Sequence, residues 1–310
     1  MAKRKIALAG IGKIAIDQHI PTLAQSSDWE LAAAVSRHHK VEGVPNFTDF
    51  AQMLDAHPDI DVVSLCMPPV PRFDYAKAAL EAGRHVMLEK PPGATLSEVF
   101  ALENMAAARG LTLYTSWHSR SARFVPAAKA WLQGKRIDSF AVTWKEDVRK
   151  WHPGQDWVFE PGGMGIFDPG INALSIVTEI LPDPIHLRSA TLDFPANRDT
   201  PIAARLDFVH PHGAKVSAEM DWDHQGDDVW DIVAVTDAGT LALRNGGAVM
   251  EIDGVPKGDE AGLAGEYPAL YAHMADLVAQ GRSDVDLAPM LHVSDALTLG
   301  KRNTVSDFDW

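Results

Sequence analysis

The sequence contains almost no cysteine and no long hydrophobic run. Cys66 is the single cysteine among 310 residues, so one chain can form neither an internal disulfide nor a zinc site built on cysteines. A chain without disulfides suits a reducing compartment, and we expect a cytoplasmic protein. The apolar stretch from Ile6 to Ala9 is far too short for a signal peptide or a membrane span, so no membrane partner is expected.

Basic residues are also scarce relative to acidic ones. Lys and Arg number 28 against 42 Asp and Glu, which gives a formal net charge of -14. Such a surface repels phosphate backbones, so nucleic acid is excluded as an expected partner. The 13 histidines show no tight metal-ligand spacing, and no metal site is expected. An anionic cofactor is still compatible, because backbone amides at a helix N-terminus can hold its phosphates.

The first third of the chain alternates apolar strand patterns with helical patterns. Nearly continuous apolar strands predict a parallel sheet that helices cover on both faces, which is the doubly wound α/β arrangement. Thr48 is the expected N-cap of the second helix. The expected strands are 5–9, 31–35, 61–66, 85–88 and 111–114, and the expected helices are 14–24, 48–54, 73–82 and 97–109.

The pattern changes near residue 122. One more helix is expected at 124–132, and strands that alternate apolar with polar residues follow it, as in sheets with one buried face. We therefore expect a Rossmann domain over residues 1–122 and an α+β domain over 123–310, with a large, mainly antiparallel open sheet. Residues 258–266 are expected to form a solvated loop. The strands of the second domain are expected at 139–146, 185–194, 202–208, 215–221, 231–236 and 240–243.

A glycine motif follows the first strand. Gly10-Ile11-Gly12-Lys13-Ile14-Ala15 fits G-x-G-x-x-A, and it opens a helix within a βαβ unit. Gly10 permits the tight turn, Gly12 lets the backbone approach a pyrophosphate, and Ala15 keeps helix and strand close. The motif predicts dinucleotide binding, against the alternative of a plain glycine turn.

The end of the second strand indicates which dinucleotide is bound. NAD enzymes usually place Asp or Glu there, but this chain has Ser36-Arg37-His38-His39-Lys40. Arginine can bind a ribose 2′-phosphate that a carboxylate would repel. We expect NADP, with NAD as the alternative, held by Arg37 and Ser36; in the competing interpretation Arg37 merely stacks on adenine. The other expected dinucleotide contacts are Lys13, Ile14, Met67, Pro68, Glu89 and Lys90.

Two further segments carry candidate catalytic residues. Lys90 lies in Glu89-Lys90-Pro91, at the C-terminal end of the fourth strand, where open α/β sheets bind ligands. The peptide bond before Pro91 is expected to be cis. Asp168 and Asn172 follow a glycine-rich stretch and are four residues apart, so in a helix they share one face. The alternatives are a solvated lysine and an aspartate that caps a helix.

Together these motifs resemble the Gfo/Idh/MocA family of oxidoreductases. The resemblance covers nearly the whole chain and rests on Gly10–Ala15, Glu89–Pro91, the Arg123-Phe124-Val125-Pro126 segment and the glycine-rich region from Gly162 to Asn172. It implies a Rossmann domain followed by an α+β domain whose open sheet often mediates oligomerisation, so a homo-oligomer is expected.

Asn172 departs from the pattern of many family members, which carry a histidine there as proton acceptor. Asparagine cannot accept a proton at neutral pH, so the role passes to Asp168 or Lys90, while Asn172 orients the substrate hydroxyl. We expect Lys90 and Asp168 to meet beside the nicotinamide.

Asparagine at this place is similar to the aldose 1-dehydrogenases, which act on sugars such as L-arabinose or D-galactose. This resemblance implies oxidation of the anomeric carbon to a lactone. Other family activities stay open as alternatives: an inositol or related polyol dehydrogenase, or a non-catalytic regulator that binds dinucleotide and sugar. The side chains expected to contact the sugar are Lys90, His118, Glu146, Trp151, His152, Asp168, Asn172 and Trp230.

Overall fold

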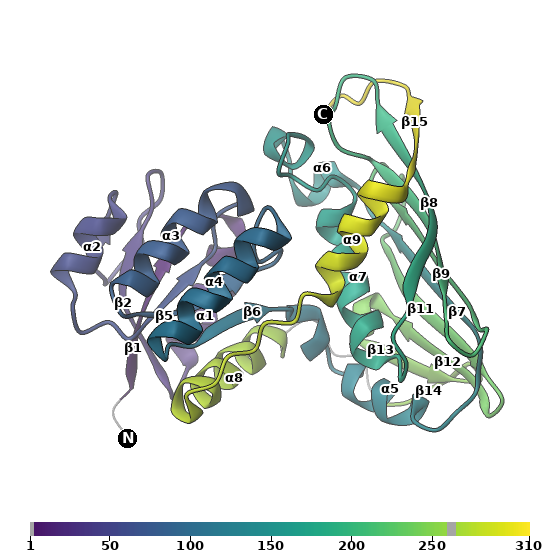
Figure 1. The fold of residues 1–310 in the computed structure, drawn as a ribbon, viewed down its shortest axis with the longest axis horizontal. Helices are drawn as coiled ribbons and strands as arrows, with labels where there is room; N and C mark the ends of the chain where they lie inside the picture. Colours follow the sequence, from purple (N-terminus) through teal and green to yellow (C-terminus); the bar gives the residue numbers. More distant parts are fainter. Residues whose placement is uncertain (1–2, 259–264) are drawn as a thin grey trace. The chain divides into compact units, whose positions relative to one another are not determined.

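The computed structural model describes residues 3–258 and 265–310, and these form two compact units (Figure 1). The first unit comprises Met1–Trp117 and Tyr267–Asp286, and the second comprises His118–Glu266 and Leu287–Trp310. Most of the loop expected at 258–266 lies outside the described residues. Within the described residues, no helix combines the length and apolar character that crossing a membrane requires.

The sheet of the first unit has six parallel strands. Their order is β3-β2-β1-β4-β5-β6, the order typical of dinucleotide-binding α/β domains. This confirms the expected Rossmann-type fold. The strands are β1 (Arg4–Ala9), β2 (Trp29–Val35), β3 (Asn46–Phe47), β4 (Val62–Leu65), β5 (His85–Glu89) and β6 (Leu113–Ser116).

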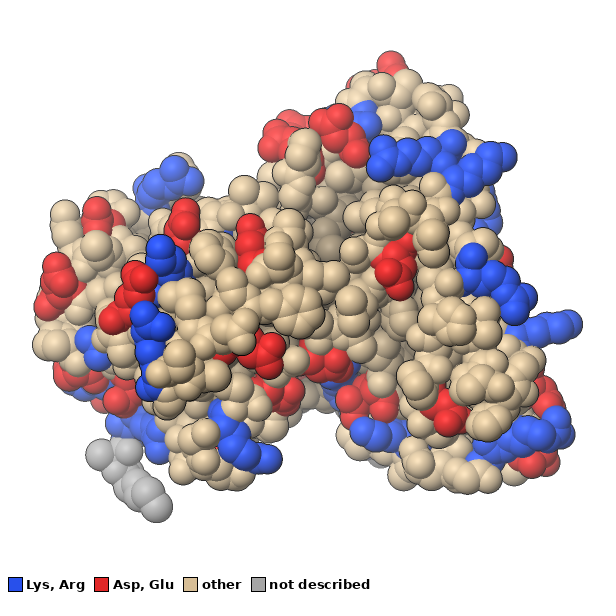
Figure 2. Space-filling model, in the orientation of Figure 1, with Lys and Arg blue, Asp and Glu red and all other residues tan. Residues whose placement is uncertain are grey.

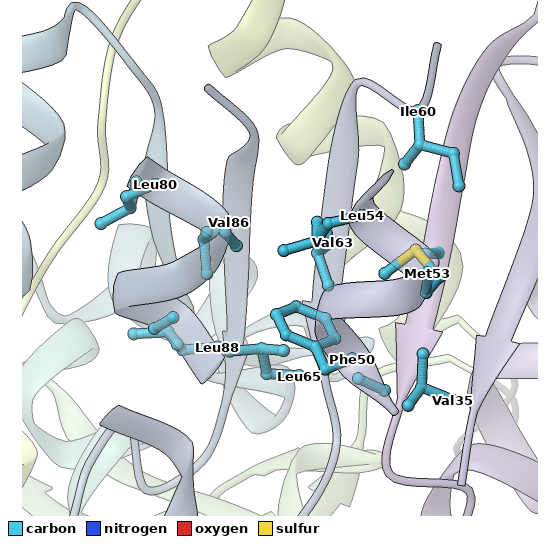
Figure 3. Packing of buried hydrophobic residues seen from close by; sticks show 14 of the residues in the cluster. Val35, Phe50, Met53, Leu54, Ile60, Val63, Leu65, Leu80, Val86 and Leu88 are labelled. Carbon is cyan, nitrogen blue, oxygen red and sulfur yellow. The ribbon is translucent and has the colours of Figure 1, made fainter. Parts of the chain in front are cut away.

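Helices cover both faces of this sheet. On one face α2 (Phe50–Ala56), α3 (Pro69–Glu81) and α4 (Leu96–Arg109) bury a cluster that includes Phe50 and Leu88 (Figure 3). The opposite face is covered by the π-helix η1 (Ala15–His19), by α1 (Ile20–Gln25) and by α8 (Glu266–Gln280). Both faces are therefore buried, which explains the continuous apolar strands.

The position of α8 corrects the expected domain division. Tyr267, Tyr271 and Met274 recur at helical spacing and pack in the core beside β1 and α1, although they follow the second domain in sequence. The chain therefore returns to the first unit, and Figure 1 shows α8 among the elements of that unit. The expected boundary after residue 122 also moves, to residue 117.

The N-cap of α2 is a second correction. Asp49, not Thr48, is the capping residue, because its carboxylate accepts the N–H of Gln52 at 2.9 Å. The helix consequently begins at Phe50, two residues later than the sequence pattern indicates.

The second unit contains a nine-stranded mixed sheet. Most neighbours pair antiparallel, whereas β7–β10 and β8–β15 pair parallel, which confirms the expected mainly antiparallel sheet. The strand order is β14-β13-β12-β11-β7-β10-β9-β8-β15. The strands are β7 (Ile137–Lys145), β8 (His186–Pro195), β9 (Ala203–Val209), β10 (Lys215–Asp221), β11 (Val229–Thr236), β12 (Gly239–Arg244), β13 (Val249–Ile252), β14 (Val255–Pro256) and β15 (Lys301–Val305).

Three helices pack together on one face of this sheet: α5 (Val125–Leu132), α7 (Phe167–Ile180) and α9 (Ala288–Leu299) (Figure 1). Burial alternates along β9 and β10, so one side of each strand faces this layer and the other carries exposed residues. Gly170 lets α7 lie close to β10, since a Cβ there would come within 2.6 Å of the Met220 sulfur.

Short helical segments and charged side chains complete the surface. The short segments are η2 (His118–Ser121), α6 (Val148–Trp151), η3 (Asp156–Phe159) and η4 (Asn245–Gly247). On the face drawn in Figure 2, acidic and basic side chains are interspersed over both units.

Candidate functional site

The glycine motif shapes the turn between β1 and η1. Gly10 has φ +88°, and a Cβ on it would lie 2.4 Å from the backbone nitrogen of Met67. A Cβ on Gly12, in contrast, would meet no atom within 4 Å. Gly10 is thus required by the protein itself, whereas the space beside Gly12 is open, as a bound pyrophosphate needs. The turn therefore fits a dinucleotide.

Two further residues of the turn, Lys13 and Ile14, differ in exposure. Lys13 forms an ion pair with Asp17 one turn later, and both side chains are about half exposed. Ile14 is half-buried and immediately precedes the π-helix. Both residues directly follow Gly12, beside which the space is open.

The end of β2 presents the predicted specificity segment. The hydroxyl of Ser36 accepts the N–H groups of His38 at 3.3 Å and His39 at 3.2 Å, which forms a tight turn. Arg37 lies in this turn with an exposed side chain. The turn therefore offers a guanidinium and no carboxylate to an approaching ribose.

Lys90 follows β5 in a loop that is fixed by a buried arginine. The Arg72 guanidinium, on α3, donates hydrogen bonds to the carbonyls of Met67, Glu89 and Pro91. The bond between Lys90 and Pro91 is cis, as expected. The loops after β4 and β5 are thereby tied together at the C-terminal edge of the sheet, where Met67 is buried and Pro68 is exposed.

Glu89 points into the protein. It is 3% exposed, and its carboxylate accepts the N–H of Lys90 at 2.7 Å and the hydroxyl of Tyr267 at 2.9 Å. The predicted contact of Glu89 with the cofactor stays a prediction. The described contacts tie its carboxylate to the loop that carries Lys90.

Asp168 is buried near the start of α7. The cap position is Ile166, and no side chain caps the helix, so the alternative of a capping aspartate is wrong. Its carboxylate lies 3.2 Å from Nε2 of His152, which follows α6. Asn172 lies on the same helix one turn later and is half-buried. Sequence analysis named all three residues, and the structure brings His152 and Asp168 together.

The contacts of His152 define where its protons lie. Gln155 Oε1 accepts the indole N–H of Trp157 at 3.1 Å, which identifies this atom as the amide oxygen. The same oxygen lies 3.3 Å from Nδ1 of His152, so Nδ1 carries a proton. Nε2 faces a carboxylate, and a hydrogen bond there needs a second proton. The pair therefore places an imidazole nitrogen within hydrogen-bond distance of a buried carboxylate.

Four tryptophans lie around Glu146, and we call them the tryptophan wall: Trp144, Trp151, Trp222 and Trp230. The two carboxylate oxygens of Glu146 accept the indole N–H groups of Trp222 at 3.1 Å and Trp230 at 2.8 Å. Trp230 stacks on Trp144 with ring centroids 5.9 Å apart, and Trp151 lies 5.6 Å from Trp230. Glu146 was predicted as a direct sugar contact, and this stays a prediction; the hydrogen bonds that the structure describes run from its oxygens to these two tryptophans.

The tryptophan wall contacts the pair formed by His152 and Asp168. The rings of Trp222 and His152 pack edge to face with centroids 5.5 Å apart. The indole nitrogen of Trp151 is buried and has no hydrogen-bond partner among the described residues, so it could donate to a ligand hydroxyl. Nδ1 of His118 lies 2.6 Å from the carboxylate of Glu266, and the predicted contact of His118 with the sugar stays a prediction.

The segment before α7 is rich in glycine, and close backbone contacts leave no room there for a Cβ atom. A Cβ on Gly163 would lie 2.2 Å from the carbonyl oxygen of Trp157, and one on Gly165 would lie 2.2 Å from that of Pro201. These glycines seat the start of α7 against its neighbours, and thereby position Asp168.

Several of these residues were not predicted from the sequence. Trp222, Gln155, Glu266 and Arg72 belong to none of the recognised motifs, and their roles depend on tertiary contacts. The repeated tryptophans were a signal for the aromatic wall, but only Trp151 and Trp230 were predicted from it, and not Trp144 or Trp222. The expected meeting of Lys90 with Asp168 joins residues of different units and stays a prediction.

Comparisons with known proteins agree with this architecture. Residues 4–116 match a family model described as an oxidoreductase family with an NAD-binding Rossmann fold. Galactose 1-dehydrogenase from Pseudomonas fluorescens is 40% identical over 305 residues, which is 98% of each chain.

Solved structures match over the same length. The crystal structure of D-galactose-1-dehydrogenase from Rhizobium etli has 53% sequence identity and a TM-score of 0.95, and the match covers 100% of this chain and 99% of that one. A 3-ketoreductase from Actinomadura kijaniata, 18% identical with a TM-score of 0.84, shares the fold over 98% of this chain and 100% of that one.

Proposed function

The chain belongs to the Gfo/Idh/MocA family of oxidoreductases, and from this premise we propose that it is an NADP-dependent aldose 1-dehydrogenase that oxidises D-galactose at the anomeric carbon. The full-length similarity to two galactose dehydrogenases supports the sugar and the position of oxidation. L-Arabinose is the closest alternative substrate, because its pyranose differs from that of D-galactose by one hydroxymethyl group.

The observation that carries the proposal is the pair of His152 and Asp168 beside the tryptophan wall. Oxidising a sugar hydroxyl requires a proton acceptor, and binding a pyranose favours flat apolar surfaces with few polar groups. The second unit provides the acceptor at Asp168, the surface at Trp151 and Trp230, and a buried indole N–H at Trp151.

The proposed reaction removes a hydride and a proton from the sugar. The C1–H bond breaks with its electron pair, the O1–H bond breaks to give a proton, and a C1=O double bond forms to yield the lactone. The nicotinamide ring of the bound cofactor supplies the hydride acceptor. Asp168 accepts the proton and becomes a neutral carboxyl group, and His152, with Nε2 3.2 Å away, orients that group. Asn172 orients O1 through its amide, and Lys90 acts as the second polar group at the reacting oxygen.

NADP is proposed as the preferred cofactor because of the turn after β2. Arg37 is exposed there, no acidic residue lies between positions 36 and 40, and Ser36 fixes the turn. A guanidinium adds charge-assisted hydrogen bonds to a 2′-phosphate, whereas the 2′-hydroxyl of NAD would gain far less.

The test is a panel of sugars with each cofactor. The purified protein is mixed with NADP or NAD and with D-galactose, L-arabinose, D-glucose, D-xylose or myo-inositol, and formation of reduced nicotinamide is followed by absorbance. We expect the highest kcat/KM for D-galactose with NADP, and a product that hydrolyses to an acid. A ketone product would favour a polyol dehydrogenase. Binding of both ligands without turnover would favour a regulator.

A further inference from the structure

A buried polar cluster lies beneath the loop that carries Lys90. It consists of His19 at the end of η1, Glu89 at the end of β5, and Tyr267 and Tyr271 on α8. Each of these side chains belongs to a residue that is at most 3% exposed. All four lie in the first unit, and none has a role in the chemistry proposed above.

The cluster is continuous. Nδ1 of His19 lies 2.6 Å from the hydroxyl of Tyr271, and Nε2 lies 3.2 Å from Oε1 of Glu89. The hydroxyl of Tyr267 donates to the same oxygen at 2.9 Å. The second carboxylate oxygen accepts the backbone N–H of Lys90 at 2.7 Å. Side chains from a helix nearly 180 residues away are thus connected to the peptide of Lys90.

The cluster contains groups of opposite charge that compensate each other. A buried carboxylate is costly unless a positive group and hydrogen-bond donors compensate it. Burial alone lowers the pKa of His19, but the surrounding Cys66, Tyr271 and Glu89 outweigh burial and raise this pKa well above its ordinary value. Since a carboxylate only accepts hydrogen bonds, Nε2 of His19 must be the donor to it. His19 therefore both orients and compensates Glu89.

Arg72 fixes the other side of the same loop. Its guanidinium donates to the carbonyl that precedes Lys90 and to the carbonyl of Pro91. The backbone of Lys90 is consequently held through its N–H on one side and through the adjacent carbonyls on the other. The Lys90 side chain has several rotatable bonds, and a fixed backbone limits the positions that its ammonium group can reach.

We infer that His19, Glu89 and Tyr267 form a positioning network that sets the backbone of Lys90 for catalysis. The inference rests on the role of Lys90 in the proposed function. It predicts that loss of the network lowers kcat far more than it weakens NADP or sugar binding, because the loop then samples positions from which Lys90 does not reach the reacting oxygen.

Four variants test the network. Glu89→Gln and His19→Leu remove its charges, His19→Gln keeps an N–H donor toward Glu89, and Tyr267→Phe removes one hydroxyl with little change in volume. The control is His85→Leu, at the opposite end of β5, which loses a hydrogen bond from the N–H of Thr112. Thermal melts identify the variants that fold.

The first readout is steady-state kinetics. We expect kcat to fall about tenfold or more in Glu89→Gln and His19→Leu, with KM and the NADP Kd changed by less than about threefold. His19→Gln should recover most of the loss seen in His19→Leu, and His85→Leu should resemble the wild type. Turnover within about twofold of the wild type in folded His19→Leu and Tyr267→Phe would overturn the inference.

The second readout needs no activity. Pro91 and Pro92 have no N–H, so hydrogen exchange in this loop reports on few amides, including that of Lys90. We expect faster exchange of this amide in Glu89→Gln and Tyr267→Phe than in the wild type and in His85→Leu. Unchanged exchange would refute the network. If the wild type oxidised no sugar, the proposed function would fail, while this measurement would still decide the positioning role.

Discussion

The two units build their binding surfaces from different parts of the chain. In the first, the cofactor side consists largely of backbone: the turn at Gly10 and Gly12 and the loops after β4 and β5. In the second, the candidate substrate side consists of side chains, with Asp168 and His152 beside a wall of tryptophans. Backbone groups can recognise the pyrophosphate that all dinucleotides share, whereas the side chains of the second unit would set which substrate fits.

Asp168→Asn is expected to have the largest effect, and to lower turnover without changing the affinity for the cofactor. Asparagine has nearly the same shape but cannot accept the proton, so kcat should fall by about 10²–10⁴-fold. The Kd for NADP, measured by quenching of tryptophan fluorescence, should stay near the wild-type value. Asp207→Asn, on an exposed position of β9, is the matched control. A folded Asp168→Asn enzyme with near-normal turnover would remove Asp168 from the chemistry.

Arg37→Ala tests whether a side chain of the first unit sets the preference for NADP over NAD. Losing charge-assisted hydrogen bonds to a 2′-phosphate should reduce the ratio of kcat/KM for NADP over NAD by about 10–100-fold. Lys40→Ala removes another exposed cation from the same segment and should change this ratio little. An equal loss with both cofactors would instead show that Arg37 stacks on adenine.

The two glycines of the motif test the claim that backbone makes the cofactor side. Gly12→Ala adds a methyl group that meets no protein atom within 4 Å, so thermal stability should hold while NADP affinity falls by about tenfold. Gly10→Ala should instead destabilise the fold by about 1–3 kcal/mol or more, because φ is +88° and Met67 is in the way. NADP binding by Gly12→Ala that equals the wild type would contradict the assignment of the pyrophosphate to this glycine.

The same contrast explains what the sequence could predict. The Rossmann-type sheet, the glycine turn and the loop of Lys90 were predictable, because each is a contiguous segment next to a strand of clear pattern. The return of α8 was not, since Tyr267 and Tyr271 find their partners only through tertiary packing. His19 gave no signal for the same reason: its partners lie 70 and 252 residues away.

The substrate side was predictable only in its composition. Asp168, His152 and Trp230 were named from residue type and neighbourhood, and the structure brings them into one connected cluster. Their division of labour was not visible, because Glu146 resembles a hydroxyl-binding carboxylate until Trp222 and Trp230 are placed on its two oxygens.

Glu146→Gln is expected to have the smallest effect and tests this division of labour. Glutamine offers one acceptor oxygen where two indole N–H groups need one each, so one indole is left without its partner at a cost of about 1–3 kcal/mol. Trp230 should then lose its fixed orientation, and KM for the sugar should rise several-fold while kcat changes less. Glu219→Gln, in an exposed pair with Lys145 on the neighbouring strands, is the matched control and should leave both unchanged. The double variant with Trp230→Phe separates the two roles. If Glu146 acts by positioning the ring, Glu146→Gln will add little to the rise in KM that Trp230→Phe causes; if Glu146 binds the sugar directly, the two effects on KM will add.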